Sequence, residues 1–133
     1  MWKIDPKDPV PVYEQVANQL RYAVARGRYS AGDKLPSVRG LARETLLNPN
    51  TIVRVYRDLE HEGITRTEGG RGVFVTEEAP DVCRAATRAI VRRRIELALA
   101  EADRAGIPPE EVEATIHEVL AARQRDPKGA ASG

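Results

Sequence analysis

The segment that decides the fold is residues 48–75, which read NPNTIVRVYRDLEHEGITRTEGGRGVFV. Asn48 can cap a helix with its side chain, and Pro49 suits the first helical position because its missing N–H would be unpaired there anyway. Apolar residues at helical spacing follow as one stripe: Ile52, Val55, Tyr56 and Leu59. The segment therefore begins with a helix, which we expect to end at Gly63.

Two short β-prone runs come after this helix, at residues 64–67 and 73–75. Between them lies EGGRG at residues 68–72, a glycine-rich stretch that is typical of a hairpin tip. The segment as a whole therefore predicts a helix followed by a two-stranded hairpin.

Two further helices are expected upstream of this segment. Residues 11–26 carry apolar side chains at three-to-four spacing, which predicts an amphipathic helix ending before Gly27. Ser37 can cap a short second helix that carries Leu41, Ala42 and Leu46. Three helices followed by a hairpin are the order of a winged helix-turn-helix, in which the third helix is the recognition helix.

The composition changes around residues 76–80, and beyond them Ala, Arg and Glu favour helix. The pattern predicts one long helix, a break at residues 106–109 and a second helix from Pro109. Two helices cannot hide so wide an apolar face by themselves, so we expect this face to mediate dimerisation. The candidate dimerisation residues are Val82, Ala86, Ile90, Ile95, Leu97, Val112, Ile116 and Leu120.

The predicted fold class is therefore mainly α with a small β-hairpin. A winged helix-turn-helix DNA-binding domain is expected at residues 9–77 and a two-helix dimerisation or effector region at residues 80–125. We expect the tail at residues 126–133 to be disordered.

Several polar and basic residues of the first domain suit contact with DNA. Asn can pair with adenine edges, Thr can touch a thymine methyl group, and Arg can take guanine or phosphate. Glycines at the wing tip let the main chain approach DNA closely. The candidate DNA-binding residues are Ser37, Arg39, Asn48, Asn50, Thr51, Arg54, Arg57, Gly70 and Arg71.

The motifs of this domain resemble those of the GntR family of bacterial transcription regulators. The matching stretches are PVYEQ at 11–15, GDKLPSVR at 32–39, NPNT at 48–51, VYRDLE at 55–60, EG at 62–63 and GRGVFV at 70–75. The short helical remainder is similar to that of the YtrA-type subfamily, in which two C-terminal helices serve dimerisation. The resemblance implies a homodimeric regulator, usually a repressor, that binds a pseudo-palindromic operator. It also implies DNA contacts by Arg39, by residues 48–51 and by Gly70.

The chain departs from the family pattern at two positions. Many members carry Glu where Gly40 stands, so the second helix lacks the third residue of a capping box. Many also carry Arg where Val53 stands, whereas here the nearest arginine is Arg54. A shift by one residue turns a side chain by about 100° around the helix, so the resemblance implies base reading by Asn50 and Thr51 more firmly than by Arg54.

Composition excludes several other classes of protein. The 133 residues have a net charge of +1 and a single cysteine, Cys83, so no internal disulfide can form and a cytoplasmic location is expected. No run is long and apolar enough for a membrane span or a signal peptide. His61 and His117 are solitary, and no nucleophile–base pairing or phosphate loop is apparent, so we expect no metal, no cofactor and no enzymatic activity.

Alternatives remain open at this point. The winged helix can be a protein-interaction adaptor, with Arg54 and Arg57 paired to the acidic residues of their own helix. The chain can also be a metabolite sensor whose small-molecule effector occupies a pocket at the dimer interface. The five arginines between residues 84 and 94 are either a solvated face or partners of the acidic stretch 96–118 in a second subunit.

Overall fold

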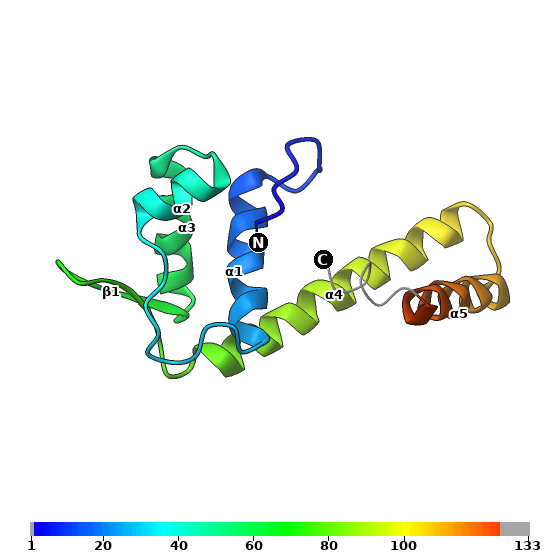
Figure 1. The fold of residues 1–133 in the computed structure, drawn as a ribbon. Helices are drawn as coiled ribbons and strands as arrows, with labels where there is room; N and C mark the ends of the chain where they lie inside the picture. Colours follow the sequence, from blue (N-terminus) through cyan, green and yellow to red (C-terminus); the bar gives the residue numbers. More distant parts are fainter. Residues whose placement is uncertain (1, 126–133) are drawn as a thin grey trace. The chain divides into compact units, whose positions relative to one another are not determined.

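The helices and the hairpin follow one another in the predicted order (Figure 1). The computed structural model describes residues 2–125, so the predicted disordered tail lies outside the described residues. The elements are α1 (Val12–Ala25), α2 (Val38–Thr45), α3 (Pro49–His61), β1 (Thr65–Glu68), β2 (Gly72–Val75), α4 (Ala79–Arg104) and α5 (Pro109–Arg125). The predicted fold class, mainly α with a small β-hairpin, is confirmed.

The predicted caps form at the starts of α2 and α3. The Oγ of Ser37 accepts a hydrogen bond from the N–H of Gly40 at 3.0 Å. The Oδ1 of Asn48 accepts one from the N–H of Asn50 at 2.8 Å, and Pro49 occupies the first turn. These bonds satisfy amide groups that have no partner inside their own helices.

The expectation that Leu46 belongs to the apolar side of α2 is wrong. The helix ends at Thr45, whose hydroxyl donates to the backbone oxygen of Leu41 at 2.7 Å. Leu46 follows in the left-handed conformation and is 90% exposed. Leu47, not Leu46, packs against the core.

The first three helices enclose an apolar core. Helix α3 packs against both α1 and α2 and brings its predicted stripe inside. Burying a large apolar side chain contributes about 1.5–3 kcal/mol relative to leaving it exposed. The largest fully buried side chains include Leu20, Leu41, Ile52, Leu59, Ile64 and Val75.

The wing is an antiparallel hairpin, with Thr65 opposite Val75 and Glu68 opposite Gly72. Thr65, Val73 and Val75 are buried, and Arg66 and Phe74 form a cross-strand pair on the other side of the ribbon. Alternation therefore buries one face of the hairpin and leaves the other for charged side chains.

A third backbone segment, residues 32–35, pairs with the free edge of β2. The N–H of Leu35 donates to the oxygen of Val73 at 2.9 Å, and the N–H of Val75 donates to the oxygen of Asp33 at 2.9 Å. Lys34 thereby lies opposite Phe74. This segment continues directly into the start of α2, so it connects the wing with the helix-turn-helix.

By its contacts the chain divides into one unit up to Ala89 and another from Ile90 onward. The first turns of α4 belong to the first unit, where Ala79 and Cys83 are buried and Val82 packs against the core. Burial raises the pKa of the Cys83 thiol to about 11. The thiol therefore stays protonated near neutral pH, as suits a packing residue and not a reactive one.

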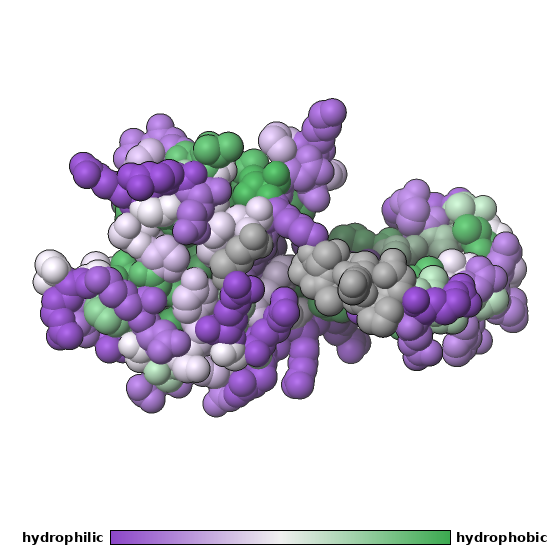
Figure 2. Space-filling model, viewed as in Figure 1, coloured by the Kyte–Doolittle hydropathy of each residue, from purple (hydrophilic) through white to green (hydrophobic). Residues whose placement is uncertain are grey.

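In the second unit the rest of α4 and α5 form a helical hairpin (Figure 1). Helix α5 has no buried residue, and α4 has none beyond Cys83. Large apolar side chains are 40–55% exposed along both helices and the connection between them. Figure 2 shows some green atoms among the purple ones over this part of the chain. We call this set the C-terminal apolar face: Val91, Ile95, Leu97, Leu99, Ile107, Ile116, Val119 and Leu120.

Candidate nucleic-acid interface

Three hydrogen bonds fix α3 relative to the start of α2 and to the wing. The hydroxyl of Tyr56 donates to the backbone oxygen of Pro36 at 2.6 Å, immediately before the cap of α2. The carboxylate of Glu60 accepts from the N–H of Thr67 in β1 at 2.8 Å, and the hydroxyl of Thr65 donates to the oxygen of Tyr56 at 3.4 Å. Burial raises the pKa of Tyr56, so its hydroxyl remains a donor. The start of α2, helix α3 and the wing are therefore held as one unit.

One side of α3 faces the wing. Glu60 marks this side because it bonds to β1. Val53 lies seven residues earlier, close to two helical turns, and therefore on the same side. Its side chain is 39% exposed.

Another side of α3 faces α1. The guanidinium carbon of Arg54 lies 3.8 Å from the centre of the Tyr13 ring, a cation–π contact between α3 and the first turn of α1. Asn50 and Arg57 lie on the exposed crest between the Val53 side and the Arg54 side.

Most of the predicted DNA-binding residues are accessible. Thr51 is half-buried, and the other eight are exposed: Ser37, Arg39, Asn48, Asn50, Arg54, Arg57, Gly70 and Arg71. Within residues 2–125, neither Arg54 nor Arg57 makes an ion pair with a carboxylate. The acidic residues of α3 thus do not neutralise these two arginines.

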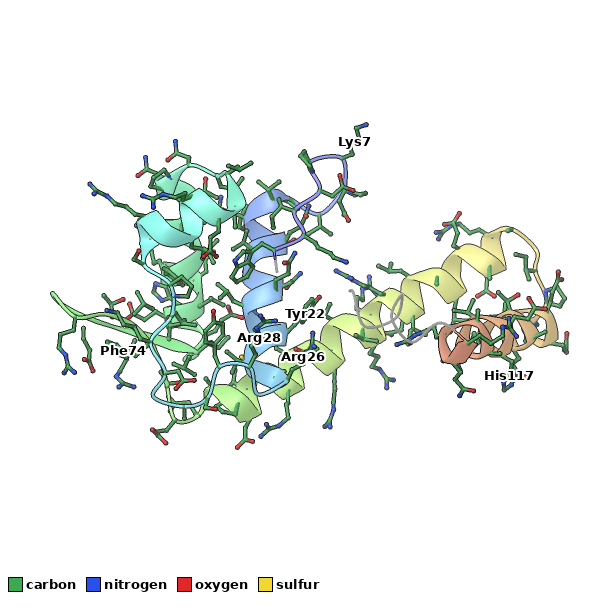
Figure 3. The ribbon with its side chains drawn as sticks, viewed as in Figure 1. Lys7, Tyr22, Arg26, Arg28, Phe74 and His117 are labelled. Carbon is green, nitrogen blue, oxygen red and sulfur yellow. The ribbon has the colours of Figure 1, made fainter. Side chains whose placement is uncertain are left out.

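The wing carries a cluster of charges around one aromatic ring. The two carboxylate oxygens of Glu68 pair with Arg66 at 3.1 Å and with Arg71 at 3.2 Å. The guanidinium carbons of Arg66 and Arg71 lie 5.6 and 5.8 Å from the centre of the Phe74 ring, whose position Figure 3 shows. Glu68 and Phe74 therefore hold both arginines along the hairpin.

Lys34 adds a further cation beside the wing. A Cβ on residue 72 would lie 2.8 Å from the Cε of Lys34, so glycine at this position makes room for the lysine stem. Sequence reasoning missed Lys34 and Arg66 as part of the candidate interface. Strand alternation places Arg66 on the face of the hairpin opposite to Thr65, so its exposure could have been predicted from the sequence. No sequence signal predicts the pairing of residues 32–35 with β2, which places Lys34 beside the wing.

The helix-turn-helix part of the interface is basic. Residues 37–57 carry four arginines and one glutamate, and this glutamate, Glu44, accepts a hydrogen bond from the indole N–H of Trp2 at 2.7 Å. Over the part of the chain that the structure describes, no three His, Cys, Asp or Glu side chains gather where they would hold a metal ion. In the same residues no helix is long and apolar enough to cross a membrane.

Comparison with known proteins identifies a family with the same arrangement. Residues 12–75 match the family described as "Bacterial regulatory proteins, gntR family". The chain is 36% identical to the HTH-type transcriptional repressor YtrA of Bacillus subtilis over 121 residues, which are 91% of this chain and 93% of that protein.

Solved structures agree with this relationship. A GntR family transcriptional regulator from Listeria monocytogenes superposes with a TM-score of 0.71 at 32% identity, over 86% of this chain and 98% of that one. YtrA from Sulfolobus acidocaldarius, a GntR-family transcription factor, does so with a TM-score of 0.54 at 30% identity, over 90% of this chain and 97% of that one. The resemblance that the motifs indicated is thus confirmed along nearly the whole length. The chain belongs to the GntR family, with a YtrA-type architecture, and is a DNA-binding transcription regulator and not an enzyme.

Proposed function

We propose that the chain is a homodimeric repressor that binds a pseudo-palindromic operator. The start of α2, helix α3 and the wing of each subunit would occupy one half-site. The observation that carries the proposal is the hydrogen-bonded unit built by Tyr56 and Glu60, which presents exposed basic residues from all three segments.

The contacts divide by chemistry. Arg39 and Arg71 bind backbone phosphates from either end of the interface, and Asn50 and Thr51 read base edges at the start of α3. Arg54 binds phosphate and not a base, because its stacking on Tyr13 draws the guanidinium toward α1. Phosphate contacts of this kind supply most of the affinity and make it depend on salt.

Dimerisation is supported by the C-terminal apolar face. Isolated apolar side chains are common on protein surfaces, but eight large ones that are 40–55% exposed along two helices and their connection favour an interface. Two half-sites of a palindrome also require two copies of the reading unit related by two-fold symmetry. The name of the Bacillus subtilis relative, a repressor, supports the direction of regulation.

The decisive experiment is binding to DNA selected by the purified chain from a pool of random duplexes. Fluorescence anisotropy compares the selected operator, a single half-site and a scrambled duplex, each at several salt concentrations. We expect tight binding to the operator, weaker binding to the half-site, and protected half-sites about 10–10.5 base pairs or a multiple of that apart. Equal affinity for selected and scrambled DNA would refute sequence-specific binding and favour an adaptor.

Repression is tested separately by transcription in vitro from a promoter that overlaps the selected operator. We expect the transcript to fall as the protein saturates the operator. A rise in transcript would show activation and would leave the DNA-binding proposal intact.

A further inference from the structure

We propose that Val53 reads the methyl group of one thymine in each half-site. This inference rests on the proposed operator binding and deepens it by naming a base and an atom. Val53 is an apolar residue of the recognition helix that lies outside the buried core cluster and is 39% exposed.

Val53 lies on the side of α3 that faces the wing. Glu60, on the same side, bonds to the wing, and Tyr56, on the neighbouring line of the helix, bonds to the segment before α2. A duplex that touches both Arg39 and the wing would pass along this side. Val53, which lies near the start of α3, therefore faces the duplex.

Arg54 does not occupy that position. It lies about 100° around the helix from Val53, and its guanidinium stacks on Tyr13 of α1. The exposed side chain on the wing side of the recognition helix is thus valine and not arginine.

The chemistry of valine leaves one base feature to recognise. Valine has neither a donor nor an acceptor, and the apolar feature of the major groove is the C5-methyl group of thymine. Its branched side chain is stiff at χ1, so little rotational freedom is lost on contact. Stability does not explain the residue, because valine is a poorer helix former than the long polar residues that usually occupy exposed positions.

The test removes single methyl groups from the DNA. Each thymine of the selected operator is replaced in turn by deoxyuridine, symmetrically in both half-sites, and the dissociation constant is measured for wild type and Val53→Ala. We expect one thymine per half-site at which the replacement weakens wild-type binding by about four-fold for each methyl group lost. In Val53→Ala, deoxyuridine at that position should no longer change the dissociation constant, whereas its effect at every other thymine should match wild type. A double-mutant cycle requires this pattern for a direct contact.

Two controls keep the result interpretable. Alanine favours helix over valine but loses part of the burial of Val53, so the thermal midpoint of Val53→Ala should stay close to that of wild type. Arg54→Ala should lose affinity and yet keep the wild-type sensitivity to deoxyuridine. Equal deoxyuridine effects in wild type and Val53→Ala at every thymine, or no effect at any thymine, would overturn this inference while operator binding stands. A wild type that binds selected and scrambled DNA alike would overturn the proposed function and this inference with it.

Discussion

Leu46, in the turn between α2 and α3, has a φ of +59°. A left-handed conformation costs a residue with a Cβ about 1–2 kcal/mol. Its side chain is 90% exposed, so almost no burial offsets that cost. The turn that sets the angle between the two helices of the reading unit is therefore strained at one residue.

Replacing Leu46 with glycine should stabilise the protein. Glycine removes the strain but gives the unfolded chain more freedom, so we expect a net gain of about 0.5–1 kcal/mol in the free energy of unfolding. Urea denaturation followed by circular dichroism measures it. Arg43→Gly, at an exposed position inside α2, is the matched control and should lose about 1 kcal/mol. A loss of stability in Leu46→Gly would show that the leucine side chain has a stabilising contact.

Thr51 and Arg54 should differ in how their removal affects DNA binding. Thr51→Ala removes a base contact, so we expect operator affinity to fall by about 1–3 kcal/mol with little change on random DNA. Arg54→Gln removes a phosphate contact, so both affinities should fall alike and the salt dependence should become shallower by about one unit of slope. Anisotropy titrations on both duplexes at several salt concentrations separate the two patterns. Equal losses on operator and random DNA for Thr51→Ala would exclude it as a base reader.

At the scale of elements, the wing keeps its own arginines partly neutralised. Glu68 pairs with Arg66 and Arg71, all three side chains being at least 30% exposed. Exposed pairs of this kind contribute little to stability, so the main effect of Glu68 is on the charge that the wing offers to DNA.

Glu68→Gln should therefore strengthen DNA binding without regard to sequence. We expect a gain of about 0.5–1 kcal/mol on both operator and random DNA, with a steeper dependence of affinity on salt, because two cations become available to phosphates. Glu77→Gln removes one negative charge from an exposed residue just beyond the hairpin and is the control for net charge. If both variants gain equally, the effect comes from overall charge and not from the release of Arg66 and Arg71.

How far these elements can be predicted depends on whether their causes are local. The caps at Ser37 and Asn48 and the apolar stripe of α3 are local signals, and each correctly located its helix. The pairing of residues 32–35 with β2 could not be predicted, because it depends on a strand 40 residues further along the chain. The stacking of Arg54 on Tyr13 is equally non-local. It is the reason for proposing different DNA contacts for the adjacent residues Val53 and Arg54.

At the scale of the whole molecule, the net charge of +1 is an average over two opposite regions. Residues 37–57 are basic, whereas residues 96–118 carry seven acidic residues and one arginine. Three arginines of α4 pair within the helix, namely Arg84 with Asp81, Arg92 with Glu96 at 4.0 Å, and Arg104 with Glu101. Overall neutrality is therefore compatible with a basic surface that binds DNA.

The C-terminal apolar face predicts that two copies of the chain assemble through α4 and α5. Ile116 in α5 is 45% exposed, and an aspartate there would place a charge inside the proposed dimer interface. We expect Ile116→Asp to sediment as a single chain at micromolar concentration while wild type sediments as a dimer. His117→Asp, on the neighbouring and polar side of the same helix, should remain dimeric (Figure 3).

The same variant distinguishes assembly from recognition. Two linked reading units gain affinity from the high effective concentration of the second site, so Ile116→Asp should lose operator affinity by about a hundred-fold or more and keep the wild-type affinity for a single half-site. The thermal unfolding of the winged-helix unit should be unchanged in the variant, since α5 buries no side chain within its own chain. A dimeric Ile116→Asp protein with unchanged operator binding would place the dimer interface elsewhere. An unchanged half-site affinity would show that the reading unit is intact. The loss of operator affinity would then come from the interface between subunits.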